Sequence, residues 1–430
     1  MTQLGRRLLP AAFVAFAAFG LLAGCGGGTD RTKAHARLVN ASAGYARLDV
    51  NQAGTPRQTA LGYGQTAAYA DFDRGSDTDL TVLATGSPTA MVTLRPALAK
   101  DQYYTLLAYG GAGALATLML DDNVGTPASG QTLLRVVNAA PDAGALDVYV
   151  TAASDALAAA VPVQAGAAYG VLGSYATLAS GSWRLRVAAA GSKNDLRLDV
   201  ADLTLGSQQL VTLVVTPGAG GVLVNALALV QRGELLRLDG QQARVRAVAG
   251  VTAGGAVSAS VGGVALLAGI GAPAAGAYQL VAAGAAAPAL AVNGVGFTVP
   301  AATLAAGADY TLLVYGDAAA PLAAWIADDN RLPATAGQAR IRLVNGVAHA
   351  SGPLALALDY LPIAGGLAAG AASDYALGDA STTAQLAVTA TGAAQPLYSA
   401  SGQTIAAGSV YSVFVLGDAA APTGVLRKDR

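Results

Sequence analysis

One strand motif recurs four times along the chain, and this repeat constrains the fold more than any other feature. Each copy contains an arginine followed by small apolar residues, and the arginines are separated by 98, 111 and 96 residues: Arg37, Arg135, Arg246 and Arg342. A second strand motif closes each copy and begins at residues 104, 211, 310 and 411. Because about one hundred residues is the size of a small domain, the sequence predicts four copies of one domain.

The residues between the two motifs predict short β-strands. In the second copy, residues 183–188 and 195–200 alternate polar and apolar side chains, as in a strand with one buried face. The chain has only one glutamate and four lysines, although both residues are common in helices. We therefore predict an all-β chain. About seven short strands per copy, separated by Gly, Pro and Asp turns, are typical of an immunoglobulin-like β-sandwich.

The four predicted sandwich repeats span residues 34–130, 131–238, 239–336 and 337–430. The first and third copies both end in an Asp-Asp-Asn step, at residues 121–123 and 328–330, whereas the other two do not. This difference indicates duplication of a two-domain unit. The junction between copies one and two should therefore resemble the junction between copies three and four, and the junction near residues 232–241 should differ from both.

The N-terminus predicts export and a lipid anchor. Arg6 and Arg7 precede an apolar stretch over residues 8–23, which is typical of a signal peptide. The stretch ends in Leu-Ala-Gly-Cys at residues 22–25, which resembles the bacterial lipobox, and Cys25 is the only cysteine in the chain. We expect cleavage after residue 24, lipidation of Cys25 and a flexible tether over residues 25–33. By the same resemblance, Gly26 implies the outer membrane, with the domains periplasmic or exposed on the surface.

The opening of the second copy resembles a known family. Residues 135–143 read Arg-Val-Val-Asn-Ala-Ala-Pro-Asp-Ala, and residues 146–150 read Leu-Asp-Val-Tyr-Val. This pattern is similar to the opening signature of the DUF4397 domain, which occurs in exported bacterial proteins, usually in tandem. The second copy carries the motif best, and the third lacks its Asn and Asp. The resemblance implies no catalytic residue, because the molecular function of the family is uncharacterised. The motif residues are Asn138, Pro141, Asp142, Asp147 and Tyr149.

The chain contains few of the residues that enzymes use for catalysis. It has two histidines and one cysteine, whereas catalytic triads, zinc sites and general-base pairs draw on several His, Cys or Glu residues. We find no nucleophile elbow, phosphate-binding loop or dinucleotide-binding motif. A net charge of −1 also excludes a nucleic-acid binder. We predict a protein that is not an enzyme; the alternative is a hydrolase of envelope polymers that uses a pair of aspartates.

The Asp-Asp-Asn steps are the best candidates for an ion site. Adjacent carboxylates could bind Ca²⁺, which takes roughly six to eight oxygen ligands. The alternative is that these residues end strands and cap turns. We predict no other cofactor. The candidate ligands are Asp121, Asp122, Asn123, Asp328, Asp329 and Asn330.

Three tyrosines have the position of a structural corner. Tyr104, Tyr310 and Tyr411 each begin the closing strand, six residues after an apolar residue. Sandwich domains place a tyrosine at this corner, and its hydroxyl bonds to backbone upstream. The alternative is an ordinary strand aromatic.

The third copy has no charged residue over residues 247–308. Large apolar surfaces often mark contact sites, so we expect this copy to pack on a neighbouring copy, a partner protein or the membrane. Taken together, the sequence predicts a non-enzymatic outer-membrane lipoprotein that serves as a binding, adhesion or spacer module of the cell envelope. Its expected partners are the bilayer and an envelope polysaccharide or protein. Alternatives are a calcium-stiffened or a glycan-binding surface module.

Overall fold

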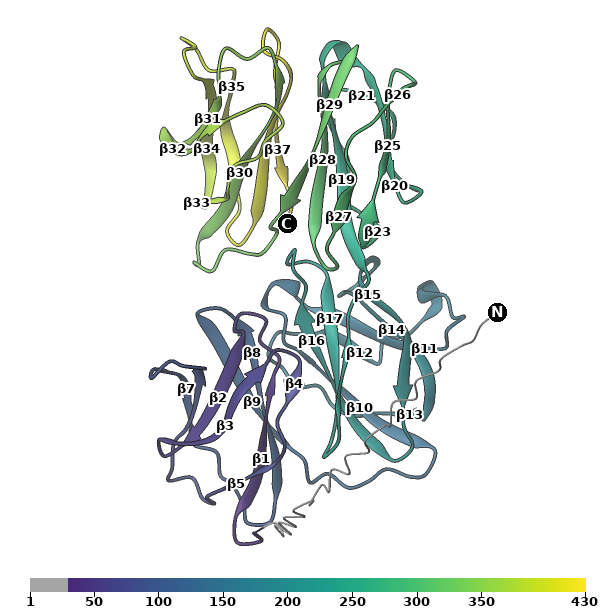
Figure 1. The fold of residues 1–430 in the computed structure, drawn as a ribbon, viewed down its shortest axis with the longest axis vertical. Coiled ribbons are helices and arrows are strands. Elements are labelled where there is room, and N and C mark those ends of the chain that lie inside the picture. Colours follow the sequence, from purple (N-terminus) through teal and green to yellow (C-terminus); the bar gives the residue numbers. More distant parts are fainter. Residues whose placement is uncertain (1–29) are drawn as a thin grey trace, which may run out of the picture.

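The computed structural model describes residues 30–430, which fold almost entirely as β-strands (Figure 1). The all-β prediction is therefore confirmed. The predicted signal peptide (1–24) and the predicted lipidation site Cys25 lie outside the described residues, as does most of the tether. Within residues 30–430, no helix has the length and apolar character needed to cross a membrane. Three short 3₁₀ turns interrupt the strands: η1 (Pro141–Ala143), η2 (Leu157–Ala159) and η3 (Thr252–Gly254).

The strands form four pairs of stacked sheets, which we call the first to fourth sandwiches. In each pair, buried apolar side chains from both sheets fill the space between them. The first sandwich has the sheets β4-β1-β8-β9, with β5 also beside β1, and β3-β2-β6-β7. Its strands are β1 (Ala34–Asn40), β2 (Arg47–Gln52), β3 (Thr55–Gly62), β4 (Gln65–Thr66), β5 (Ala70–Phe72), β6 (Leu80–Ala84), β7 (Ala90–Leu94), β8 (Tyr103–Gly111) and β9 (Ala114–Asp121).

The second sandwich has the sheets β13-β10-β16-β17-β18 and β12-β11-β14-β15. Its strands are β10 (Gln131–Asn138), β11 (Leu146–Thr151), β12 (Gln164–Ala167), β13 (Ala176–Ala179), β14 (Gly181–Ala189), β15 (Ser192–Leu205), β16 (Gln209–Pro217), β17 (Val224–Val230) and β18 (Leu235–Leu238). The extra strand β18 pairs with β17 and gives this sheet a fifth member.

The third and fourth sandwiches repeat the same order. The third has β22-β19-β28-β29, with β23 also beside β19, then β21-β20-β25-β26 and the small pair β24-β27; the fourth has β33-β30-β36-β37 and β32-β31-β34-β35. The strands of the third are β19 (Gln242–Val251), β20 (Ala256–Val261), β21 (Val264–Gly271), β22 (Ala274–Ala275), β23 (Gln279–Ala282), β24 (Gly284–Ala286), β25 (Pro288–Val292), β26 (Val295–Phe297), β27 (Ala302–Leu304), β28 (Asp309–Asp317) and β29 (Ala320–Asp328). Those of the fourth are β30 (Gln338–Ala348), β31 (Leu354–Leu358), β32 (Leu361–Leu367), β33 (Ala376–Asp379), β34 (Ser381–Ala390), β35 (Tyr398–Ile405), β36 (Val410–Asp418) and β37 (Thr423–Lys428).

The sheets stack as sandwiches, as the sequence predicts, but their strand order is not that of an immunoglobulin domain. In constant-type immunoglobulin domains, strands A, B, E and D form one sheet and C, F and G the other. Here the opening and closing strands of every sandwich pair in parallel: β1 with β8, β10 with β16, β19 with β28 and β30 with β36. These strands are buried on both faces, with one face on the sandwich core and the other on a neighbouring sandwich. Strands of this kind belong at the centre of a sheet.

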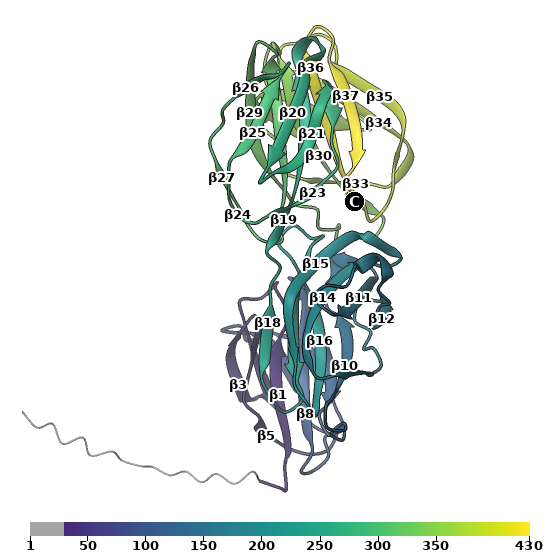
Figure 2. The ribbon, with the colours of Figure 1, turned by 90° about the vertical axis from the view of Figure 1, so that its right-hand side faces the viewer.

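The sandwiches are arranged as two side-by-side pairs (Figures 1 and 2). The first and second sandwiches meet through an apolar cluster from β1, β8, β9, β10, β16 and β17. The third and fourth meet through a cluster from the matching strands β19, β28, β29, β30 and β36. The prediction that these two junctions resemble each other is therefore confirmed. Val248, from the stretch without charged residues, lies in the second cluster, so the third sandwich does pack on a neighbouring copy.

The contact between the two pairs is of a different kind. The glycine-rich tip of the β16–β17 hairpin enters the other pair, where the Gly220 N–H donates to the Gly307 carbonyl at 2.7 Å and the Asn330 N–H donates to the Gly220 carbonyl at 3.0 Å. A Cβ on Gly220 would lie 2.8 Å from the Asp309 backbone nitrogen, so this position needs glycine. The junction between copies two and three therefore differs from the other two, as the duplication predicts.

Candidate binding site

The Asp-Asp-Asn steps point their buried carboxylates at hydroxyls and arginines. Asp328 is buried and accepts hydrogen bonds from Arg342 at 2.5 Å, Thr311 at 2.6 Å and Tyr278 at 2.6 Å. Burial alone would raise the pKa of Asp328, but Arg342 and Arg246 hold it below its usual range. Asp122 accepts from Thr105 at 2.5 Å. Within residues 30–430, no three His, Cys, Asp or Glu side chains lie together as a metal site would require.

The two steps look alike in sequence but are offset by one residue in space. Thr105 pairs with Leu120, and Thr311 pairs with Ile326. With this register, Asp122, the second aspartate of the first step, has the same position as Asp328, the first aspartate of the later step. The hairpins β8–β9 and β28–β29 have the same length, so the offset does not come from an inserted residue. The Asp-Asp-Asn triplet begins one residue earlier along β9 than along β29.

The remaining residues of the steps are also bound by their neighbours. Asp329 accepts from Arg331 at 2.7 Å and Arg340 at 2.9 Å. These bonds hold the pKa of Asp329 well below its usual range, although partial burial opposes them. Asn330 donates to Asp309 at 2.7 Å, and Asn123 donates to Asp121 at 2.6 Å. The steps therefore act as strand ends and as partners for arginine.

The four repeated arginines make the same contacts in every sandwich. Each donates from Nε to a hydroxyl of the closing strand at 2.9–3.0 Å and lies 4.5–4.8 Å from the ring centroid of a tyrosine. These tyrosines were not predicted from the sequence, although one recurs between 32 and 40 residues after each arginine. The sets are Arg37–Thr105–Tyr69, Arg135–Thr212–Tyr175, Arg246–Thr311–Tyr278 and Arg342–Ser412–Tyr375.

The family-motif residues lie in structural positions of the second sandwich. The Asn138 side chain donates to the carbonyls of Gly144 and Ala167 and so joins the two sheets. Pro141 opens the turn η1. Asp147 accepts from the backbone N–H groups of Gly166 at 2.8 Å and Gly191 at 2.9 Å.

The other two motif residues have different surroundings. Asp142 reaches into the other pair of sandwiches and accepts from the Leu332 N–H at 3.0 Å. Tyr149 is buried on β11, and its hydroxyl lies 3.4 Å from Asp147. These contacts hold loops and sandwiches together.

The three predicted corner tyrosines each accept one backbone hydrogen bond. The donors are the N–H groups five residues upstream: Ala99 for Tyr104 at 3.2 Å, Ala305 for Tyr310 at 3.0 Å and Ala406 for Tyr411 at 2.9 Å. This is the bond that a corner tyrosine makes.

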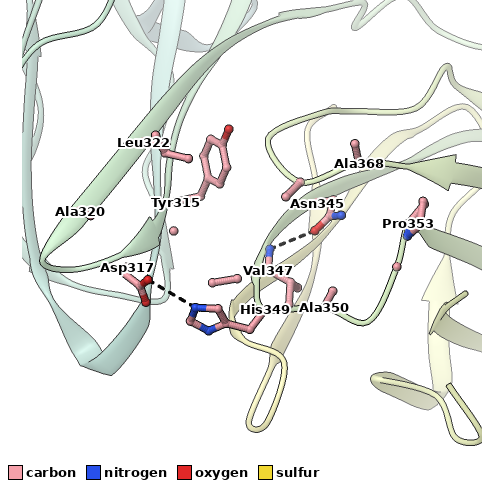
Figure 3. A pocket seen from close by; sticks show the side chains of 14 residues that line it. Tyr315, Asp317, Ala320, Leu322, Asn345, Val347, His349, Ala350, Pro353 and Ala368 are labelled. Carbon is pink, nitrogen blue, oxygen red and sulfur yellow. Dashed lines mark hydrogen bonds and ion pairs between the residues drawn. The ribbon is translucent and has the colours of Figure 1, made fainter. Parts of the chain in front are cut away.

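A pocket of about 430 Å³ opens between the third and fourth sandwiches, at the tip of the β28–β29 hairpin (Figure 3). Tyr315 and Leu322 line it from the third sandwich, and Val347 and Pro353 line it from the fourth. Leu322 is 54% exposed. The pocket therefore combines apolar walls with access to solvent, as ligand sites commonly do.

His349 joins the two sandwiches at the edge of this pocket. Its Nδ1 lies 2.7 Å from the Asp418 carboxylate on β36. Its Nε2 lies 3.3 Å from the Asp317 carboxylate on β28, and Figure 3 shows this second pair. The hydrogen bond to Asp418 and the nearby charge of Asp317 raise the pKa of His349. Neither His349 nor Asp317 was predicted from the sequence as part of a site. The two lie far apart in sequence, so no local pattern could have joined them.

A second pocket of about 610 Å³ continues along the same strand. It is lined by residues 325–327 of β29 and by residues 370–375 of the fourth sandwich. The first pocket takes its lining from residues 320 and 322 of β29 and from residues 368 and 369. We call the two pockets together the β29 groove. It runs between β29 and the loop 368–375, and the Tyr315 hydroxyl, packed against Gly370, lies between its two halves.

One small residue accounts for the opening of the first pocket. In the second sandwich, Tyr169 occupies the equivalent loop and packs edge-to-face on Tyr109, with ring centroids 5.6 Å apart. The N–H after each loop residue donates to the asparagine of the opening strand, at Gly64, Gly170 and Gly370, so Tyr63 and Ala369 hold the same loop position as Tyr169. The ring that fills this space between the first and second sandwiches is therefore absent at Ala369.

The comparisons with known proteins give one family match. The model described as "Domain of unknown function (DUF4397)" matches residues 34–149 and 243–357, which together exceed half of the chain. Each matched region covers one sandwich and the opening strands of the next, so the matches follow the two-sandwich repeat. No curated protein matches.

Two solved structures show weak similarity. One is CBMbc, a family CBM26 module from Eubacterium rectale Amy13K solved with maltoheptaose, at 11% identity over 42% of this chain and 91% of that chain, with a TM-score of 0.15. The other is the Bacillus anthracis TIE protein, at 9% identity over 86% of this chain and 66% of that chain, also with a TM-score of 0.15.

Proposed function

The chain belongs to the DUF4397 family, whose domain has no assigned function, and we propose that it is a non-enzymatic binding protein of the cell envelope that takes its ligand in the β29 groove. The observation that carries this proposal is the pocket at Ala369, which a tyrosine fills in the companion pair. A space that is closed by a large side chain in one copy and open in another, with charged groups at its edge, has the character of a binding site.

The surroundings of His349 favour binding over catalysis. Both ring nitrogens face carboxylates, so neither is directed at a serine or threonine hydroxyl as a general base would be. The Asp317 carboxylate, which lines the pocket, instead presents hydrogen-bond acceptors and negative charge to the ligand.

We further propose that an acyl chain on Cys25 anchors the protein in the outer membrane. The lipobox-like residues and the lone cysteine support this location. Metabolic labelling with a palmitate analogue tests it: the wild-type chain should incorporate the label and fractionate with membranes. A Cys25→Ala variant should not incorporate the label, and a labelled Cys25→Ala chain would contradict the anchor.

In-cell photocrosslinking tests the binding proposal. A photoreactive residue replaces Leu322 in the groove or, as a control, Val295, which is 72% exposed on β26 of the third sandwich. We expect an adduct at position 322 that is absent at position 295. Introducing Ala369→Tyr should abolish the adduct by filling the pocket, whereas Val295→Tyr should leave it unchanged. Identical adducts at both positions, or an adduct that Ala369→Tyr leaves unaltered, would contradict the proposal. A chain with no groove-specific adduct would act as a spacer alone.

A further inference from the structure

The strand that lines the groove, β29, is the last strand of its sheet, and among the described strands it pairs with β28 alone. Alternate residues of an edge strand direct their backbone N–H and C=O groups away from the sheet. Pro321 has no N–H to give to β28, and the carbonyl of Ala327 accepts from Arg342 of the fourth sandwich at 3.4 Å. Both observations show that the backbone N–H and C=O groups that point away from the sheet belong to residues 321, 323, 325 and 327.

In the part of the chain that the structure describes, the outward groups in the middle of β29 have no hydrogen-bond partner. Among residues 30–430, no strand, loop or side chain hydrogen-bonds to the backbone of Ala323 or Trp325 from the groove side. Leu322 and Ala327 are exposed, and of the nine residues of β29 only Ile326 and Asp328 are buried. The groove therefore offers unpaired backbone groups along a half-exposed strand.

The same edge in the second sandwich is already occupied. There, β18 pairs antiparallel with β17, with Ala226 opposite Leu238 and Ala228 opposite Leu236. The closing strands β16 and β28 occupy the same place in their sandwiches, with Leu213 corresponding to Leu312 and Val215 to Val314. Their pairing partners therefore correspond as well: Ala228 has the position of Trp325, and Ala226 has the position of Ala323. The edge position is thus one that accepts an extended segment of chain.

The segment β18 also contacts the neighbouring sandwich across its groove. Arg237, opposite Leu227, lies with its guanidinium 5.4 Å from the ring centroid of Tyr63. Tyr63 holds the loop position of Ala369. In the β29 groove, this position leaves open space, and Asp317 lines the pocket beside it. The Asp317 carboxylate suits a basic side chain where Arg237 lies in the occupied groove.

We propose that the β29 groove binds an extended polypeptide segment of a partner protein, which pairs antiparallel with β29 as β18 pairs with β17. The segment carries small or apolar residues and a basic residue opposite Ala324. Backbone hydrogen bonds provide the affinity and the pockets select side chains, as in other cases of strand addition. This inference rests on the proposed function and names the class of its ligand.

A synthetic peptide with the sequence of residues 233–240, which contain β18, is the probe. Added to the full chain in detergent at up to millimolar concentration, it should slow amide hydrogen exchange at Ala323 and Trp325. Two peptides N-methylated at alternate sets of amides provide matched controls. The peptide methylated at the amides that face β29 should bind at least tenfold more weakly than the unmethylated peptide. The peptide methylated at the other amides should bind about as well, because those amides point away from β29.

The protein variant Ala323→Pro removes an outward N–H and leaves the β28 pairing intact, so it should keep the wild-type melting temperature and lose at least tenfold in peptide binding. Ala324→Pro should instead lower the melting temperature, because its N–H faces β28. Absence of protection at β29 with millimolar peptide, or equal binding to Ala323→Pro, would overturn the strand proposal. If maltoheptaose binds and Ala369→Tyr abolishes that binding while Ala323→Pro does not, the binding function holds and the strand proposal fails.

Discussion

Tyr169 packs edge-to-face on Tyr109 between the first and second sandwiches, with ring centroids 5.6 Å apart. In the other pair, Tyr315 has the place of Tyr109, but Ala369 stands where Tyr169 would meet it. The two pairs share a common junction architecture, and this exchange leaves one with a filled space and the other with a pocket. The filled junction between the first and second sandwiches therefore serves as a control for the open junction between the third and fourth.

Removal of the ring should reproduce the pocket in the first pair. Tyr169 is 39% exposed, so Tyr169→Ala should cost about 1–2 kcal/mol, less than for a fully buried aromatic. Chemical denaturation followed by intrinsic fluorescence measures the loss. Tyr360→Ala is the control, because Tyr360 is 82% exposed and its loss should cost no more than about 0.5 kcal/mol. Equal costs for the two variants would show that Tyr169 contributes no packing at the junction.

The buried charges should respond unequally in the two pairs. Asp328 faces Arg342 at 2.5 Å, so Asp328→Asn leaves the buried Arg342 without its counterion and should cost about 3–5 kcal/mol, whereas Arg246 keeps Asp429. The carboxylate of Asp122 accepts from the hydroxyls of Thr105 and Tyr69, which an asparagine oxygen can replace, so Asp122→Asn should cost about 1 kcal/mol.

Urea denaturation of both variants measures this difference. The exposed Asp374→Asn serves as the baseline and should lie within about 0.5 kcal/mol of wild type. A similar cost at Asp122 and Asp328 would mean that Arg342 does not need the Asp328 charge.

The sequence predicted the strands well because their alternation is local. The opening and closing motifs also located the central strands of every sandwich. The pairing of the strands was not predictable. Arg37 contacts Thr105 because β1 and β8 pair in parallel, and most of the first copy lies between these two strands in the sequence. For this reason the sequence predicted sandwiches but not the order of their strands. The turns between strands show where a chain reverses, but they do not show which strand becomes its neighbour.

The candidate site was the least predictable part. Asp317 and His349 belong to different copies, and their contact depends on how two sandwiches pack. The Asp-Asp-Asn steps repeat in the sequence, yet the strand registers shift one step by one residue relative to the other, so that Asp122 corresponds to Asp328. The more informative signal was the loss of a large residue at position 369, which becomes meaningful only once the loops at Tyr63 and Tyr169 are aligned with it.

Calcium should leave the stability of the chain unchanged. The carboxylates of Asp328 and Asp329 are already neutralised by arginines, and a cation would have to displace them. The melting temperature in EDTA should therefore equal that in millimolar Ca²⁺. A calcium-dependent rise that Asp121→Asn removes would instead establish a metal site at the first step and support the calcium-stiffened alternative.

The bridge made by His349 should make the junction between the third and fourth sandwiches depend on pH. Its pKa is raised by the hydrogen bond to Asp418 and by the charge of Asp317, so the stabilisation is fully present below the ordinary histidine value of 6.5 and is lost as the pH rises through the folded-state value. The pKa of Asp418 is lowered by the Ala420 N–H and by His349, so at the acidic end the stabilisation falls as the pH drops below the ordinary aspartate value of 3.8.

The bridge should therefore be strongest between about pH 4 and pH 6.5. Melting temperatures of wild type and His349→Gln, measured from pH 4 to pH 9, should differ most in this window and converge above it. Asp418→Asn should reduce the difference, because it removes the closer of the two carboxylates. A gap between wild type and His349→Gln that stays constant with pH would show that His349 acts through packing and not through its charge.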